Sequence, residues 1–237
     1  MLDRLVRERK ENMKPEKSVI GIVMLNTSFP RPVGDIGNPD TWPFETRYKT
    51  VKAALVSEIV QSELPAAVVI QDIQDAIDEL VEEGVDVITT SCGFLGALQS
   101  EIQNTLPVPF ISSALLWLPE LRQLYGDEAT FGVLTFDSRK LRPLHFGIAG
   151  EGGCVIEGVE SGLELHRVVT GGLPGLDERQ ACQDVLDAAV RLKSRAPGIS
   201  ALILECTNMS PYREVIEHES GLPVFDINSL IFKQLES

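Results

Sequence analysis

VDVITTSCGFLG, residues 85–96, is the stretch that indicates the fold. Its opening run, VDVIT, is short and mostly apolar, as in a strand buried on both faces of a parallel sheet. Small hydroxylic residues, a cysteine and a glycine follow, which is typical of a tight turn between a strand and a helix. The same order occurs in ISALILECTNM, residues 199–209. Two of the four cysteines, Cys92 and Cys206, therefore follow strands that look equivalent.

Strand-like and helix-like segments alternate along the rest of the chain. SVIGIVML, residues 18–25, is apolar and β-branched, whereas QDIQDAIDELVEEG, residues 71–84, places its apolar residues on one side of a helix. Such alternation predicts parallel βαβ crossovers. We expect strands at 18–25, 66–70, 85–89, 108–112, 130–136, 154–160, 199–205 and 223–227. We expect helices at 46–61, 71–84, 93–104, 114–125, 138–149, 177–194 and 210–219.

The order of elements repeats once, which indicates a duplicated unit. The sequence predicts an α/β fold of two similar Rossmann-like α/β/α subdomains, residues 18–113 and 114–222, with mostly parallel sheets related by a pseudo-twofold axis. We interpret residues 1–17 as an N-terminal arm and residues 223–237 as a strand and helix that return to the first subdomain. Ligands of open α/β sheets bind beyond the carboxyl ends of the strands, so we expect the active site in the cleft between the subdomains.

The composition limits the partners of the protein. The chain has 237 residues and a formal net charge of −14, so we expect no binding to nucleic acids or anionic membranes. No apolar run reaches the roughly 20 residues of a membrane-spanning helix, and residues 1–17 lack the apolar core of a secretory signal. We therefore expect a cytoplasmic protein.

The cysteines show neither a metal-binding nor a disulfide pattern. They form no CxxC pair and lie far in sequence from the histidines, so we expect no metal and a reducing compartment. Cys182 shares a helix face with Val185 and Ala189, and Cys154 begins a strand, so we interpret both as structural. No nucleotide-binding glycine motif and no GxSxG motif is present, so we expect neither a nucleotide-binding protein nor a serine hydrolase.

Cys92 and Cys206 allow two interpretations. Each could be a small buried residue, because unpaired cysteine is common in protein cores. A thiol beside the N–H groups that begin a helix has instead a lowered pKa and is reactive. Because both occupy equivalent points of a repeat, we expect the two thiols to face each other across the cleft. The loop GDIGNP, residues 34–39, follows the first strand, and we interpret it as a lid.

The two cysteine segments resemble those of the aspartate/glutamate racemase superfamily. Thr90-Ser91-Cys92-Gly93 is similar to its first cysteine motif and Leu204-Glu205-Cys206-Thr207 to its second, and the resemblance extends from residue 18 to about residue 230. It implies cofactor-independent proton transfer, with Cys92 and Cys206 as the acid/base pair on opposite faces of a carbon acid. It also implies that the substrate-binding residues are Asn26, Thr27, Thr90, Ser91, Gly93, Phe94, Thr135, Thr207 and Asn208.

Three positions depart from the pattern of that superfamily. Asn26-Thr27 stands where Asp-Ser is common, Asn208 where His or Glu is common, and Glu205 where Gly is usual. The groups that assist each thiol and recognise an α-amino group are therefore changed.

The resemblance implies a racemase or epimerase of a small carboxylate, such as an amino acid or a hydantoin, working by two-base proton transfer. One alternative is a cis–trans isomerase of a small dicarboxylate, of the maleate isomerase type, with one cysteine as nucleophile. The other is a non-catalytic protein that binds a small molecule. An exposed face of an α/β domain also allows a homodimer.

Overall fold

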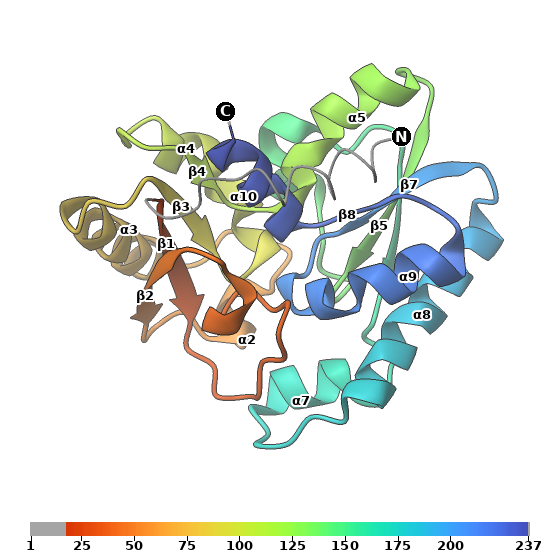
Figure 1. Cartoon of the computed structure of the whole chain (residues 1–237), viewed down its shortest axis with the longest axis horizontal. Coiled ribbons are helices and arrows are strands. Elements are labelled where there is room, and N and C mark those ends of the chain that lie inside the picture. The colour runs from red at the N-terminus through yellow and green to blue at the C-terminus, as the bar shows by residue number, and fades with distance from the viewer. Residues whose placement is uncertain (1–17, 237) are drawn as a thin grey trace.

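Two parallel four-stranded sheets form the framework of the protein, one in each half of the molecule (Figure 1). The computed structural model describes residues 18–236. The first sheet has the order β2–β1–β3–β4 and comprises β1 (Val19–Leu25), β2 (Glu45–Val51), β3 (Val87–Thr90) and β4 (Phe110–Ile111). The second has the order β6–β5–β7–β8 and comprises β5 (Thr130–Thr135), β6 (Cys154–Gly158), β7 (Ile199–Leu204) and β8 (Val224–Phe225).

The two sheets have the same topology. β1 and β5 occupy equivalent places, as do β3 and β7, and every strand pair is parallel. The expected α/β class with two similar subdomains is confirmed. The carboxyl ends of β3 and β7, where the two cysteines lie, consequently point to equivalent edges of their sheets.

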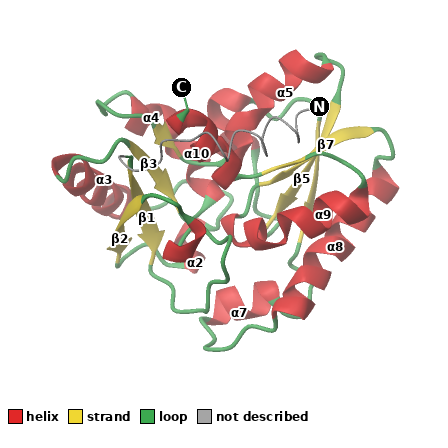
Figure 2. Ribbon diagram, in the orientation of Figure 1, coloured by secondary structure: helices red, strands yellow, loops and turns green. Residues whose placement is uncertain are grey.

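Helices cover the sheets (Figure 2). α3 packs against β1 and β2, and α8 packs against β5 and β6. The α-helices are α2 (Val56–Ile59), α3 (Ala67–Glu82), α4 (Gln99–Gln103), α5 (Leu118–Tyr125), α6 (Pro143–Phe146), α7 (Leu165–Gly171), α8 (Glu178–Arg195), α9 (Arg213–Ser220) and α10 (Ile227–Leu235). The 3-10 helices are η2 (Pro39–Thr41), η3 (Gly93–Leu98), η4 (Ala114–Trp117), η5 (Gly147–Ala149) and η6 (Thr207–Tyr212).

The strand expected at residues 66–70 is wrong, because these residues form the start of α3. Val69, Ile73, Ile77 and Leu80 are buried and lie on one side of the helix at separations of three and four residues. The apolar run AAVVI thus belongs to the amphipathic pattern that follows it. A short apolar run does not by itself distinguish a buried strand from a buried helix.

The helix expected at residues 46–61 is also wrong. Residues 45–51 form the edge strand β2, and only α2 is helical in this region. Tyr, Thr and Val favour a strand here, and the whole of β2 pairs with β1. On the face covered by α3, the ammonium group of Lys49 lies 2.7 Å from carboxylate oxygens of Glu79 and Glu83. The acidic partners of Lys49 belong to another element, so the sequence around β2 does not indicate them.

Several smaller expectations also differ from the structure. The helices expected at 93–104, 114–125 and 138–149 are each divided into a 3-10 helix and an α-helix, and α7 was not expected. β8 belongs to the second sheet, so only α10, which contacts β4, reaches the first subdomain from residues 223–237. The expected N-terminal arm, residues 1–17, lies outside the described residues. Within residues 18–236, none of the helices has the length and apolar character needed to cross a membrane.

Candidate active site

Cys92 and Cys206 occupy equivalent positions in the two halves. Each follows a central strand, β3 or β7, and each is the N-cap residue of a 3-10 helix, η3 or η6. The backbone carbonyl of each accepts the N–H of the third residue along, Leu95 or Met209, which closes the first turn. The duplicated fold therefore presents the two thiols in the same local geometry.

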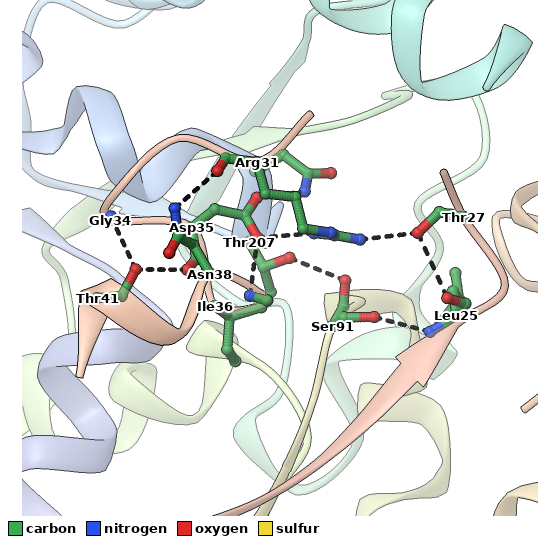
Figure 3. Close-up of polar contacts among 12 residues, drawn as sticks. Leu25, Thr27, Arg31, Gly34, Asp35, Ile36, Asn38, Thr41, Ser91 and Thr207 are labelled. Carbon is green, nitrogen blue, oxygen red and sulfur yellow. Dashed lines mark hydrogen bonds and ion pairs between the residues drawn. The ribbon is translucent and has the colours of Figure 1, made fainter. Parts of the chain in front are cut away.

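A direct hydrogen bond joins the two cysteine turns (Figure 3). The hydroxyl of Thr207 donates to the backbone carbonyl of Ser91 at 2.8 Å. The hydroxyl of Ser91 in turn accepts the backbone N–H of Leu25 at the end of β1, at 2.9 Å. The ends of three strands are thus held together at the meeting point of the two subdomains.

Both thiols line a single cavity of about 30 Å³, which both halves of the chain enclose. Its polar wall contains a guanidinium, a carboxylate and an amide, from Arg31, Glu205 and Asn208. The remainder is largely apolar and includes three phenylalanines, Phe29, Phe94 and Phe136. The arrangement combines two potential proton carriers with fixed charges of both signs.

Most of the expected substrate-binding residues line this cavity. They are Thr27, Ser91, Gly93, Phe94, Thr207 and Asn208. Cys154 and Cys182, interpreted as structural, are half-buried free thiols outside it.

Asn26, Thr90 and Thr135 were expected in the cleft but do not line the cavity. The exposed Asn26 donates its side-chain N–H to the carbonyl of Lys52. The hydroxyl of Thr90 donates to backbone carbonyls in the turn around Cys92 and in the segment after β4. The hydroxyl of Thr135 donates to the Glu205 carboxylate. Thr90 and Thr135 thus contact groups of the site from behind, whereas Asn26 lies apart from it.

Arg31 was not expected in the site, and it connects the loop after β1 to the cavity (Figure 3). Its guanidinium donates to Asp35 at 2.7 Å and to the hydroxyl of Thr27 at 2.9 Å, and it lies 4.4 Å from the centre of the Phe29 ring. The Asp35 carboxylate is 1 % exposed and also accepts from the side-chain amide of Asn208, at 2.7 Å. The loop therefore supplies a positive charge whose orientation is fixed by buried partners.

The loop 34–39, expected to be a lid, packs closely on the second half of the chain. The carbonyl of Gly34 accepts from the side chain of Asn228, at 2.7 Å. Gly34 has a φ of +102°, and a Cβ atom there would lie 2.7 Å from the backbone of Pro211 in η6. This contact therefore requires glycine, both for the conformation and for the space.

The thiols do not have the lowered pKa expected from their turns. Burial and the nearby Glu205 carboxylate together raise the pKa of Cys92 to about 12, against a backbone N–H from Phe94 that lowers it. Burial and Glu205 likewise raise the pKa of Cys206 well above its usual value. Desolvation of the thiolate outweighs the few N–H groups that a single 3-10 turn supplies. Both thiols are therefore protonated at neutral pH.

The two thiols differ in their hydrogen bonding. The S–H group of Cys206 donates to the side-chain oxygen of Asn208 at 3.6 Å, and the amide of Asn208 is oriented by its bond to Asp35. Within residues 18–236, no comparable side-chain acceptor receives the thiol of Cys92. Of the two thiols, Cys206 is thus the one that a side chain holds in its protonated form.

Glu205 is the second group that was not expected to act in the site. It directly precedes Cys206 and is 0 % exposed. One carboxylate oxygen, Oε2, accepts from the hydroxyl of Thr135 at 2.7 Å, and the other, Oε1, has no hydrogen-bond partner in the described part of the chain. Burial raises the pKa of this carboxyl to about 7, against the hydrogen bonds from Thr135 and the Phe136 backbone. The sequence signal was the departure from glycine before the second cysteine.

Comparison by sequence relates the chain to one group of enzymes. It is 31% identical over 215 residues to a dimethylsulfoniopropionate lyase of Durusdinium sp. clade D, covering 87% of this chain and 70% of that protein. It is 29% identical over 217 residues to dimethylsulfoniopropionate lyase 3 and 30% over 223 residues to dimethylsulfoniopropionate lyase 6 of Emiliania huxleyi. The chain spans 56% of the length of each of these two relatives. No protein-family profile matches the sequence.

Comparison by structure relates the fold to the racemase superfamily. Allantoin racemase from Pseudomonas fluorescens superposes with a TM-score of 0.59 at 15% identity, over 92% of this chain and 89% of that one. Unliganded arylmalonate decarboxylase gives 0.55 at 13% identity, over 93% and 92%. Glutamate racemase from Campylobacter jejuni gives 0.53 at 15% identity, over 92% and 84%. The resemblance to the aspartate/glutamate racemase superfamily is confirmed for the fold, which at this identity carries no activity.

The expected activity is corrected by the sequence relatives. They are named as lyases and not as racemases, epimerases or isomerases, so the expectation of a two-base racemase is wrong. The error arose because one fold serves more than one reaction. The expectation of an enzyme is supported, since the relatives and structural neighbours are enzymes. This chain belongs to the dimethylsulfoniopropionate lyase family.

Proposed function

We propose that this protein cleaves dimethylsulfoniopropionate into dimethyl sulfide and acrylate. The observation that carries the proposal is the cavity in which both thiols, the Arg31 guanidinium and the Glu205 carboxylate meet, in a chain 31% identical to a dimethylsulfoniopropionate lyase. The substrate joins a sulfonium cation to a propionate anion. The cavity wall carries a charge of each sign to match.

The proposed reaction is a β-elimination. A base removes a proton from the carbon next to the carboxylate, and a double bond forms between this carbon and its neighbour. The bond from that neighbour to sulfur breaks, and its electron pair leaves with dimethyl sulfide. The proton remains on the base and is returned to water. Dimethyl sulfide leaves as a neutral molecule, so the leaving group needs no proton donor.

Cys92 is the base in this proposal. Among residues 18–236 no side-chain acceptor holds its proton, whereas the thiol of Cys206 is held in its protonated form by Asn208. A sulfonium cation bound in the same small cavity favours the thiolate, because a nearby positive charge lowers a thiol pKa. The base is thus formed only when the substrate is present.

The roles of Arg31 and Cys206 follow from the charge that develops. Removal of the proton places negative charge on the substrate carboxylate and the carbon beside it. Arg31 uses one donor on Asp35 and one on Thr27, and a guanidinium has five, so donors remain for the carboxylate. Because the one S–H proton of Cys206 is engaged with Asn208, this thiol contributes to the cavity wall and Arg31 supplies the donors. Donors that are already oriented stabilise such charge without reorganisation.

The activity can be tested with purified protein and a panel of substrates. Dimethylsulfoniopropionate, allantoin, aspartate and glutamate are incubated separately, and products are followed by proton NMR. We expect acrylate from the first substrate and no change in the others. Cys92→Ala should abolish the signal, whereas the matched control Cys182→Ala, outside the cavity, should retain it. Absence of acrylate with folded wild-type protein would refute the proposal.

A further inference from the structure

Glu205 supplies the negative charge of the cavity wall but takes no part in the proton transfer of the proposed reaction. We propose that its carboxylate is the counterion that receives the sulfonium group, and that it makes the cavity select a cationic substrate over an uncharged one of the same shape. The inference rests on the proposed function for the identity of the substrate. The cation site itself is argued from the geometry around the carboxylate.

The first observation is the unused oxygen of Glu205. Oε2 is fixed by Thr135, while Oε1 is buried without a partner among residues 18–236. The residue lines the cavity that contains both thiols. A buried carboxylate oxygen without a partner is costly to the fold, unless a ligand completes its interactions. Within the same residues, no Lys, Arg or His forms an ion pair with Glu205.

The second observation is the space made for this carboxylate by Gly93. A Cβ atom at Gly93 would lie 2.3 Å from Oε1 and 2.4 Å from the backbone carbonyl oxygen of Glu205. Gly93 lies between Cys92 and Phe94, so the free oxygen of Glu205 lies against the first cysteine turn. The unpaired charge is therefore next to the proposed base, where a bound cation would act on both.

The third observation is the chemistry of the surrounding wall. Phe94 and Phe136 line the cavity, and Phe136 directly follows the strand whose Thr135 holds Glu205. A sulfonium group has no N–H or O–H donor and is recognised by negative charge and aromatic faces, as quaternary ammonium groups are. A carboxylate among phenylalanines meets both requirements. It would suit a hydrogen-bonding ammonium group less well.

The two fixed charges also set the direction of the substrate. Arg31 is engaged with Asp35 and belongs to the first half of the chain, whereas Glu205 belongs to the second. With the sulfonium at Glu205 and the carboxylate at Arg31, the two carbons of the propionate lie between them. The reverse orientation would place like charges together.

Binding of two unreactive analogues tests the inference. One is the trimethylammonium analogue of the substrate, and the other is the uncharged isostere in which a CH group replaces the sulfonium sulfur. Affinities are measured by isothermal titration calorimetry for wild type, Glu205→Gln and the surface control Glu101→Gln. We expect wild type and the control to prefer the cation, and Glu205→Gln to reduce that preference by at least about tenfold.

Glu205→Asp supplies a second variant if the glutamine variant does not fold. It keeps the charge on a shorter side chain, so it should keep the preference for the cation with weaker affinity. Circular dichroism confirms folding of each variant. An unchanged preference in folded Glu205→Gln, or its loss in folded Glu205→Asp, would overturn the inference.

The outcomes separate this inference from the proposed function. Dimethyl sulfide release together with an unchanged preference in Glu205→Gln would leave the function standing and remove the cation site. A preference that depends on Glu205 in a protein that releases no dimethyl sulfide would leave the cation site standing and remove the lyase. Loss of turnover with an unchanged preference would assign Glu205 to proton transfer instead.

Discussion

The thiol of Cys206 donates to the side-chain oxygen of Asn208 at 3.6 Å, and this contact distinguishes the two cysteines. Asn208 is itself oriented by the buried Asp35 carboxylate, which the loop after β1 contributes. The duplicated fold places the two thiols at equivalent points, and side chains that differ between the two repeats make them different.

This asymmetry predicts unequal effects of removing each thiol. Cys92→Ala should lower kcat/KM for dimethylsulfoniopropionate by about 100-fold to 10,000-fold, because the general base is lost. Cys206→Ala should lower it less, because Cys206 transfers no proton in the proposed reaction. Steady-state assays of dimethyl sulfide release check both values, with Cys182→Ala as the control. A larger loss of kcat/KM in Cys206→Ala than in Cys92→Ala would assign the role of general base to Cys206.

The raised pKa values predict a rate that increases with pH. Glu205 has a pKa of about 7 and Cys92 a pKa of about 12, and both must lose a proton to act as proposed. kcat/KM should therefore rise from pH 6 to pH 9 without a decline at the upper end. In Glu205→Gln the part of the rise near pH 7 should disappear. A maximum below pH 7 in the wild type would contradict both assignments.

Glu205 also predicts a pH dependence of stability. Its carboxyl has a pKa of about 7 in the folded protein, against the ordinary value of 4.5 that applies to the unfolded chain. Between these two pH values the folded protein holds a proton that the unfolded chain releases. The free energy of unfolding should therefore fall as pH rises through this range, by about 3 kcal/mol for this group.

Urea unfolding of wild type and Glu205→Gln at several pH values between 4.5 and 8 measures this effect. The difference between the two proteins isolates Glu205 from the other carboxylates, and Glu101→Gln is the control for a surface site. The variant should gain stability relative to wild type as pH rises. A constant difference across the range would show that Glu205 ionises normally in the folded protein.

Arg31 predicts a defect in substrate binding. Arg31→Met should raise KM by about 10-fold to 100-fold, because a charged donor to the substrate carboxylate is lost. The single variant also leaves Asp35 without its ion pair, which destabilises the fold. The double variant Arg31→Met/Asp35→Asn removes the unpaired charge. It should recover thermal stability and keep the raised KM, whereas recovery of a normal KM would limit Arg31 to a structural role.

The sequence predicted those parts of the fold whose signals lie within the element itself, namely the buried strands and the turns after them. VDVIT and ISALILE mark the central strands β3 and β7, and the turn residues after them place both cysteines correctly. β2 was missed because ETRYKTV is half-exposed and depends on pairing with β1 and on acidic residues of α3. AAVVI was misread because its apolar side chains belong to a helix face that continues beyond it.

The site was only partly predictable, for a related reason. Cys92, Cys206 and the residues beside them follow from position in the repeat, whereas Arg31 reaches the cavity through a loop whose path is set by Asp35 and Asn208. Glu205 was visible as a departure from glycine, but its unpaired oxygen depends on Gly93 in the other half of the chain. The chemistry of a cavity between two subdomains is a property of both together.

The most direct test of the central claim is the joint quantification of dimethyl sulfide and acrylate released from dimethylsulfoniopropionate. Headspace gas chromatography measures the first product and NMR the second, for wild type and Cys92→Ala in parallel. The account predicts equal amounts of the two products from wild type and at least about 100-fold less of each from the variant in the same time. Acrylate or dimethyl sulfide formed at the wild-type rate by folded Cys92→Ala, or neither product formed by wild type, would contradict it.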